Sequence, residues 1–177
     1  MQHVINFYSL RAPFGCFSNF SAHPVTMGGL VFPTSEHYFQ AVKFEGTPHF
    51  EVVRLTATAK QAADMGRDRK LPLRPDWNAI KDRVMHVVVL AKFTQHEDLK
   101  ATLLSTGDAK LVEHTRNDSY WGDGGDGSGE NKLGLTLMAV RDEILRASNS
   151  HVTGPAADKP VFGDFGDGTP SAKRVKK

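Results

Sequence analysis

Three polar residues in one short segment have the types and the spacing to do chemistry together. Glu36, Gln40 and Lys43 stand at positions i, i+4 and i+7, so on a helix they form a single stripe. Most residues around the stripe are aromatic or aliphatic, and a helix that is apolar nearly all round is usually buried. A carboxylate, an amide and an ammonium in such a setting are costly unless they pair or take part in a reaction. The alternative is an ordinary solvent-facing stripe with a Glu–Lys pair.

A second group of candidate residues lies in segment 115–122. It joins a basic residue and an acid, Arg116 and Asp118, to two adjacent aromatic residues, Tyr120 and Trp121. Aromatic faces stack on nucleobases and arginine pairs with phosphate, so the segment could bind a nucleotide. The alternative is a plain turn in which Asp118 caps the backbone and Trp121 fills the core.

A glycine-rich loop, 122–134, follows this segment. Its first residues formally match GxGxxG, but no convincing strand precedes them and the loop is low in complexity. The chain has no GK[ST] sequence of a Walker motif, and the acids of the loop do not have EF-hand spacing. Two interpretations remain: a purely structural loop, or a loop whose free backbone amides at 130–132 meet an anion.

Metal binding, a bound cofactor and cysteine catalysis are not expected. The eight histidines are scattered, without an HxxxH pair or a cysteine partner. Cys16 is the one cysteine of the sequence; it has no evident base beside it and cannot form an internal disulfide. A reducing compartment, cytoplasm or nucleus, is therefore expected.

The composition is that of an ordinary globular domain, with 177 residues of which 40% are hydrophobic and 24% charged. Of the 22 basic and 20 acidic residues, five and three lie in 149–177, so residues 1–148 carry 17 of each. A neutral body attracts nucleic acid only weakly, so any such contact has to be local. The sequence has no run of 18 apolar residues and no signal-peptide pattern, so neither a membrane span nor a leader is expected.

The elements that must position these residues follow from periodicity, caps and turn residues. Residues 1–148 predict one helix-dominated α+β domain with a few short N-terminal strands. Strands are expected at 3–9 and 110–113, with a hairpin over 25–32 that turns at Gly28-Gly29. Helices are expected at 35–44, 48–55, 58–66, 77–93, 99–104 and 131–146, with caps at Thr34 or Ser35, Thr47, Thr58 and Asp76 and a capping box at 94–97.

Residues 149–177 predict a disordered tail, because they are rich in glycine and proline and lack apolar periodicity. The tail ends in a basic cluster, 172–177, which is either a nuclear-targeting signal or a solvated end.

Eight short blocks, in order along about residues 7–147, together resemble the NADAR (YbiA-like) family. They are GCFSNFS (15–21), FPTSEHYFQAVKF (32–44), GR (66–67), RPDW (74–77), AKF (91–93), LLSTG (103–107), YWG (120–122) and GENKLG (129–134). The resemblance implies a compact, mostly helical α+β domain that hydrolyses N-glycosidic bonds. Some members of the family cleave ribosylated intermediates of riboflavin synthesis, and others remove ADP-ribose from guanine bases of nucleic acid.

Block by block, the resemblance also implies which residues do the work. Glu36 matches the family's essential glutamate and Lys43 its lysine on the same helix, while Asp118 matches its acid before the glycine. Substrate contacts are implied for Asn19, Arg67, Trp77, Tyr120, Trp121, Glu130 and Asn131. The long GDGGDGSG loop departs from the family pattern, which leaves the loop's contacts with substrate open.

The expected mechanism follows from the charge that develops when a ribosyl C1–N bond breaks. A carboxylate near C1 stabilises the positive sugar or activates water against it, and Glu36 is placed in this role. The leaving base needs a proton, which Asp118 or Lys43 could supply. In an alternative mechanism, Lys43 attacks C1 of the opened sugar and forms an imine. Arg67 and the amides at 130–132 would hold phosphates.

The expected substrate is ADP-ribosylated guanine in DNA or RNA, because a basic tail suits work on nucleic acid. A free nucleotide-like molecule, such as a ribosylated riboflavin intermediate, is the alternative substrate. A non-catalytic reader that binds ADP-ribose without turnover is the alternative function. The protein is expected to act as a monomer, away from membranes.

Overall fold

A computed structural model of the protein describes residues 3–150, and helices are its main secondary structure. The helices are η1 (Gly15–Phe17), α1 (Ser35–Val42), α2 (His49–Arg54), α3 (Ala59–Arg67), α4 (Trp77–Gln95), α5 (Glu97–Ser105) and α6 (Lys132–Ser150). The strands are β1 (Val4–Phe7), β2 (Val25–Met27), β3 (Leu30–Phe32) and β4 (Lys110–Glu113). The predicted helix-dominated α+β fold is thereby confirmed.

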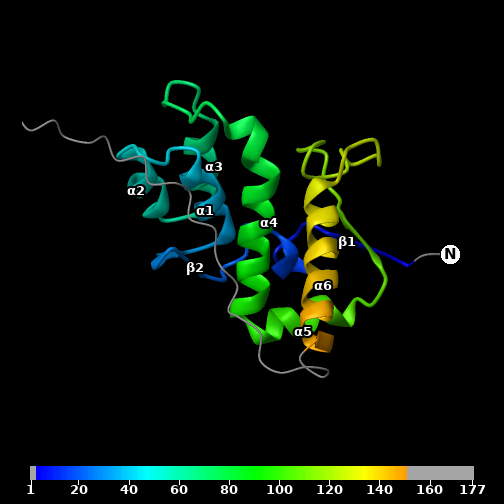
Figure 1. Cartoon of the computed structure of the whole chain (residues 1–177). Helices are drawn as coiled ribbons and strands as arrows, with labels where there is room; N and C mark the ends of the chain where they lie inside the picture. Colours follow the sequence, from blue (N-terminus) through cyan, green and yellow to red (C-terminus); the bar gives the residue numbers. More distant parts are fainter. Residues whose placement is uncertain (1–2, 151–177) are drawn as a thin grey trace, which may run out of the picture.

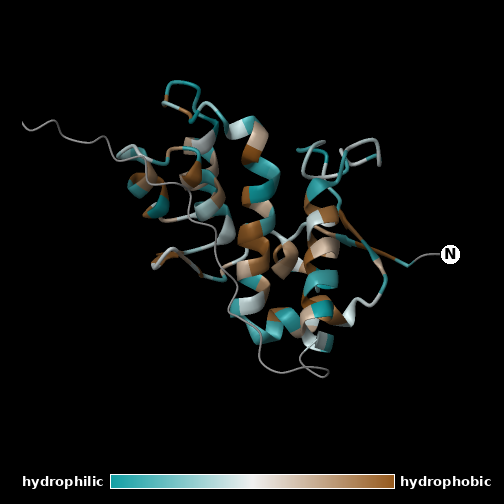
Figure 2. Ribbon diagram, viewed as in Figure 1, coloured by the Kyte–Doolittle hydropathy of each residue, from teal (hydrophilic) through white to brown (hydrophobic). Residues whose placement is uncertain are grey.

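The long helix α4 divides the molecule. Helices α1 to α3 lie on one side of it and α6 packs along the other side (Figure 1). Hydrophobic residues run along α4 and α6 where the two helices meet the core (Figure 2). Within that core, the ring of Phe17 packs edge-on against the rings of Phe7 and Phe93, with centroids 5.6 and 5.8 Å away. None of the helices within residues 3–150 is long and apolar enough to span a membrane.

The strands form two small sheets, one between distant parts of the chain and one within a local hairpin. β1 and β4 pair in parallel, with Val4 opposite Lys110, so the start of the domain is joined to a strand near its end. β2 and β3 form the predicted hairpin, whose turn residues Gly28 and Gly29 have φ of 56° and 80°. Positive φ at both turn positions is what a tight hairpin requires, and glycine adopts it without strain.

Two of the predicted helix starts are confirmed by their caps. The Thr34 side chain accepts a hydrogen bond from His37 N–H, and the Thr58 side chain accepts one from Gln61 N–H. Each bond satisfies an amide that the first turn of the helix leaves free.

Two other predicted caps do not form, although α4 begins at Trp77 as predicted. Asp76 makes no cap because its carboxylate pairs with Arg74, Nε to Oδ1 2.6 Å. The capping box at 94–97 does not form, since the Thr94 hydroxyl donates back to Leu90 O at 2.7 Å and lets α4 continue to Gln95. As a result α5 begins at Glu97, two residues earlier than expected.

The boundary predicted at residue 148 also shifts. Asn149 and Ser150, which the sequence assigns to the tail, belong to α6. The rest of the predicted tail and its basic cluster lie outside the described residues.

The start of α6 approaches β4 more closely than a side chain would allow. A Cβ atom on Gly134 would lie 2.2 Å from the backbone oxygen of Leu111. One turn earlier, Asn131 adopts φ 51° and uses its side chain to bridge the same strand, donating to Leu111 O and accepting from Glu113 N–H at 2.9 Å each. Gly134 and Asn131 together fix the distance between α6 and β4.

We expect Gly134→Ala to lower the free energy of unfolding by about 1–3 kcal/mol, because a backbone oxygen cannot move aside cheaply. Without that contact, alanine would stabilise a helix relative to glycine by about 1 kcal/mol. Denaturant unfolding measures the change, with Leu135→Ala at the exposed neighbouring position as the control. Unchanged or increased stability of Gly134→Ala would show that α6 can move away from β4.

Candidate functional site

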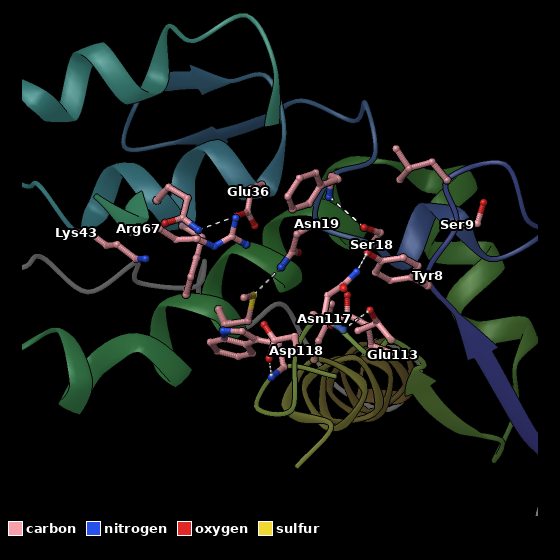
Figure 3. A pocket seen from close by; sticks show the side chains of 18 residues that line it. Tyr8, Ser9, Ser18, Asn19, Glu36, Lys43, Arg67, Glu113, Asn117 and Asp118 are labelled. Carbon is pink, nitrogen blue, oxygen red and sulfur yellow. Dashed lines mark hydrogen bonds between the residues drawn. The ribbon is translucent and has the colours of Figure 1, made fainter. Parts of the chain in front are cut away.

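A cavity of about 440 Å³ opens between α1, α4 and the segments that follow β1 and β4 (Figure 3). This volume lies in the range of about 300–1,000 Å³ that is usual for small-molecule sites. The lining residues are Tyr8, Ser9, Leu10, Ser18, Asn19, Phe20, Glu36, Phe39, Gln40, Lys43, Arg67, Met85, Glu113, Thr115, Asn117, Asp118, Trp121 and Leu133.

One wall of the cavity is the polar stripe of α1. Glu36 is only 6% exposed, and its Oε1 accepts a hydrogen bond of 2.6 Å from Gln40 Nε2. Lys43, at the C-terminal end of the helix, donates from Nζ to Gly66 O at 3.0 Å. Glu36 and Gln40 are thus buried, Lys43 is half-buried, and all three face the cavity, so the alternative of a solvent-facing stripe is wrong.

Gly66 on α3 makes room for this arrangement. A Cβ atom at this position would lie 1.8 Å from Gln40 Oε1 and 2.6 Å from Gln40 Cδ. Gln40 could escape such a clash only by moving the amide that donates to Glu36. Gly66 therefore positions Gln40 by its missing side chain and Lys43 by its carbonyl oxygen.

Burial and nearby charges shift the pKa values of two of these groups, Glu36 and Lys43. Burial raises the pKa of Glu36, and the hydrogen bond from Gln40 and the charge of Lys43 oppose that rise. Burial lowers the pKa of Lys43 to about 8; Glu36 opposes the fall and Arg67 adds to it. The ammonium also lies 5.3 Å from the ring of Trp77, on the face of an aromatic group. Near neutral pH a fraction of Lys43 is therefore an uncharged amine.

The opposite wall follows β4. Asp118 lies in a turn where its Oδ1 accepts the backbone N–H of Tyr120 and of Trp121, both at 2.8 Å. This is the capping turn that the sequence offers as an alternative, but here it also faces the cavity. Glu113 lies beside it, and burial together with the charges of nearby carboxylates raises the pKa of Glu113 to about 7.

The third wall is the loop after η1, which carries Asn19. Lys92 on α4 is 1% exposed and donates from Nζ to Cys16 O, Ser18 O and Ser21 Oγ at 2.5–2.9 Å. Burial lowers the pKa of Lys92 to about 7. The Asn19 backbone oxygen in turn accepts Glu36 N–H at 3.1 Å. A buried lysine thus holds the loop against α4, and the loop holds the first turn of α1.

The structure brings six of the ten predicted site residues to the cavity. They are Asn19, Glu36, Lys43, Arg67, Asp118 and Trp121. The other four predicted residues, Trp77, Tyr120, Glu130 and Asn131, do not line it.

Each of these four residues has a different place in the fold. Trp77 is buried behind the cavity against Phe39, with ring centroids 4.9 Å apart. Tyr120 points away and donates to Asp82 at 2.6 Å. Glu130 is exposed, and the side chain of Asn131 is hydrogen-bonded to the backbone of β4. Short sequence blocks do not separate residues that support a site from residues that face it.

The prediction that free backbone amides before α6 bind an anion is wrong. The amides of Glu130, Asn131 and Lys132 donate to the backbone oxygens of Ser119, Gly122 and Tyr120 at 2.7–3.0 Å. Because these N–H groups already have partners, they are not free to hold a phosphate.

Glu113 is the carboxyl group lining the cavity that is not among the residues predicted from the sequence. Its one signal in the sequence is a carboxylate that ends a short apolar strand, and only the fold turns that end toward α1.

Comparisons with known proteins place these features in a family. The NADAR domain model matches residues 6–145. N-glycosidase YbiA of Escherichia coli (strain K12) is 52% identical over 149 residues, which cover 81% of this chain and 93% of that protein. N-glycosidase Npun_R5314 of Nostoc punctiforme is 45% identical over 144 residues, covering 80% and 92%. Riboflavin biosynthesis protein VVA0006 of Vibrio vulnificus is 42% identical over 144 residues, covering 81% and 39%.

A solved structure agrees with these sequence matches. The NMR structure of the E. coli protein YbiA superposes with a TM-score of 0.80 at 50% identity, covering 85% of this chain and 90% of that one. The names of these relatives support an N-glycosidase function for the family.

We expect Lys43 to be acetylated at pH 7 at least about tenfold faster than Lys60, because its lowered pKa leaves more free amine. Peptide mass spectrometry after brief treatment with acetic anhydride measures both rates. Glu36→Gln should lower the pKa of Lys43 further, since the carboxylate opposes the fall, and so speed the reaction. A Lys43 that reacts no faster than Lys60 would contradict the lowered pKa.

Proposed function

The chain belongs to the NADAR family, a family of N-glycosidases, and we propose that its cavity hydrolyses the C1–N bond between a ribosyl group and a base. One observation carries the proposal: a buried carboxylate, Glu36, faces the cavity with Gln40 hydrogen-bonded to it and Lys43 on the same stripe. Burying a charged group costs folding free energy, so a buried carboxylate that faces a cavity is a candidate for a catalytic group.

In the proposed reaction Glu36 acts on C1 of the ribose. As the C1–N bond lengthens, the sugar gains oxocarbenium character, which a fixed carboxylate in a site shielded from water stabilises strongly. The same carboxylate can accept a proton from the water that attacks C1. The hydrogen bond from Gln40 fixes the Oε1 atom and leaves the other oxygen of the carboxylate for the substrate or water.

Lys43 has two possible roles in this reaction. As an ammonium it stabilises the negative charge of Glu36 and can donate a proton to a departing group. As an amine, which its lowered pKa favours, it can displace the base from C1 of an opened sugar and form an imine that water then cleaves. Trapping with borohydride distinguishes the two roles, because only an imine leaves a stable adduct on Lys43.

For the substrate we propose ADP-ribosylated guanine in DNA or RNA. Arg67 lines the cavity, and the charges of Arg69 and Lys81 reach Lys43, so cations gather on the side of α3 and the start of α4. Phosphates attached to the ribose would meet these cations. A cavity of about 440 Å³ suits the ribose and its base, and leaves the polynucleotide outside.

The second candidate substrate is a ribosylated intermediate of riboflavin synthesis. The observation that favours it is the name of the relative from Vibrio vulnificus, a riboflavin biosynthesis protein. A phosphorylated ribosylamine would use the same carboxylate and the same cations. A reader of ADP-ribose, which is the alternative to both enzymes, would bind but release no base.

The deciding experiment incubates the protein with an oligonucleotide that carries ADP-ribosyl-guanine and, separately, with a ribosylamino-pyrimidine phosphate. Mass spectrometry of each mixture detects the freed oligonucleotide or base. Release of unmodified oligonucleotide supports the first substrate, and release of the aminopyrimidine alone supports the second. Binding of ADP-ribose without any release, seen as a thermal shift, would establish the reader.

We expect Glu36→Gln to abolish turnover, with a loss of at least about 1,000-fold, while leaving the fold intact. The variant should melt at the same or a higher temperature, because the raised pKa of Glu36 means that its charge opposes folding. Product release by mass spectrometry and a thermal melt check the two parts. A variant that unfolds would remove the grounds for a catalytic glutamate, and so would one that keeps its activity.

Gly66→Ala should reduce turnover by roughly 10- to 100-fold with little change in melting temperature, since it displaces the Gln40 amide from Glu36. The matched control is Lys60→Ala on the exposed side of α3, which should behave like the wild type. Full activity of Gly66→Ala would mean that Gln40 does not position the carboxylate.

A further inference from the structure

Glu113 stands at a fixed point on the wall across the cavity from α1 (Figure 3). It is the last residue of β4, and its backbone N–H and carbonyl oxygen both form hydrogen bonds. Its N–H donates to Asn131 Oδ1, and its oxygen accepts Asp123 N–H, each at 2.9 Å. The fold, and not a free loop, therefore decides where this carboxyl group lies.

The carboxyl group of Glu113 has no hydrogen-bond donor or cation as a partner within residues 3–150. By contrast, the carboxylates of the neighbouring Asp118 and Asp123 accept hydrogen bonds from backbone N–H groups. Asp118 accepts two backbone N–H groups, and Asp123 accepts those of Thr115 and Gly125 and pairs with His114 at 2.7 Å. These donors satisfy oxygens of the two aspartates, whereas the Glu113 carboxyl group lies near Asp118, Glu36 and Asp123 without a donor of its own in the described part of the chain.

The two glutamates of the cavity therefore lie in different surroundings. Burial raises the pKa of Glu36, but the amide of Gln40 and the charges of Lys43 and Arg67 favour its carboxylate and oppose that rise. Glu113 faces Asp118, Glu36 and Asp123, and burial together with these charges raises its pKa to about 7. A pair of carboxyl groups whose environments differ in this way divides into a base and an acid.

Asp118, the acid expected from the sequence, is less free to face a leaving base. Its Oδ1 already accepts two backbone N–H groups. Its turn also sets the positions of Tyr120 and Trp121, a structural duty that Glu113 does not share.

We propose that Glu113 is a further catalytic residue, the general acid that protonates the nitrogen of the leaving base. This inference rests on the proposed glycosidase function. The bonding pair of C1–N moves to the base nitrogen, which takes the proton of the Glu113 carboxyl, so the base leaves neutral. The oxygen of water bonds to C1, and the proton of that water passes to the Glu36 carboxylate. Glu113 regains a proton and Glu36 loses one by exchange with water, so no other reactant is needed.

The test compares Glu113→Gln with the wild type and with Glu97→Gln, a matched change of an exposed glutamate on α5. The readout is kcat as a function of pH on whichever substrate the wild type turns over. We expect the wild-type rate to fall as the pH rises through about 7, where Glu113 loses its proton. Glu113→Gln should lack that fall and turn over about 100- to 10,000-fold more slowly at pH 6, while Glu97→Gln matches the wild type.

A second measurement needs no turnover and reads the titration in the wild type itself. Carbon-13 NMR of the wild type with labelled glutamate follows the protonation of each carboxyl group, and Glu113→Asp, which keeps a carboxyl group, identifies the Glu113 signal. We expect that signal to titrate near pH 7. A Glu113 that is already ionised at pH 5 would overturn the proposal.

The outcomes separate this inference from the function on which it rests. If the wild type turns over and Glu113→Gln keeps kcat within threefold and the same pH profile, Glu113 is not the acid and the glycosidase function stands. If the wild type releases base from neither substrate, the function fails and the role of Glu113 fails with it. Loss of activity together with loss of the alkaline fall supports both.

Discussion

A buried carboxylate in the first turn of α1 needs hydrogen-bond donors and opposite charge around it, and α1 and the elements that pack against it supply them. Gln40 supplies the hydrogen bond, and Lys43, one turn further on, supplies the opposite charge. α3 packs on α1 at Gly66, which gives Gln40 its space and Lys43 a carbonyl oxygen. The contact between these two helices is thus part of the chemistry as well as of the core.

The other walls are fixed by the same kind of interaction, a buried polar group that ties a loop to a helix. Lys92 anchors the loop of Asn19 to α4, and Asn131 anchors the end of β4 to the start of α6. Each anchor satisfies backbone groups that would otherwise be buried without a partner. Contacts within the fold therefore fix the walls of the cavity.

The sequence predicts what depends on near neighbours. The polar stripe of α1, the threonine caps and the Gly28-Gly29 hairpin are local, and the structure has all of them. Thr94 shows the limit, because a hydroxyl that can cap a helix can equally bond back within one. The place of Glu113 in the cavity could not be predicted, since the residues around it come from segments far apart in the chain. Asn131 was placed in the site because a block of sequence does not reveal a left-handed residue that braces a strand.

The parallel pairing of β1 with β4 has a consequence for the order of events during synthesis. β1 leaves the ribosome first, with the apolar side chains of Ile5 and Phe7, yet its partner is complete only once Glu113 has emerged. The β2–β3 hairpin and the helices α1 to α3 can form from local contacts before then, whereas closure of β1 waits for most of the domain. Until that moment the backbone groups of β1 lack their partners on β4, and Ile5 and Phe7 lack the core that buries them in the complete domain.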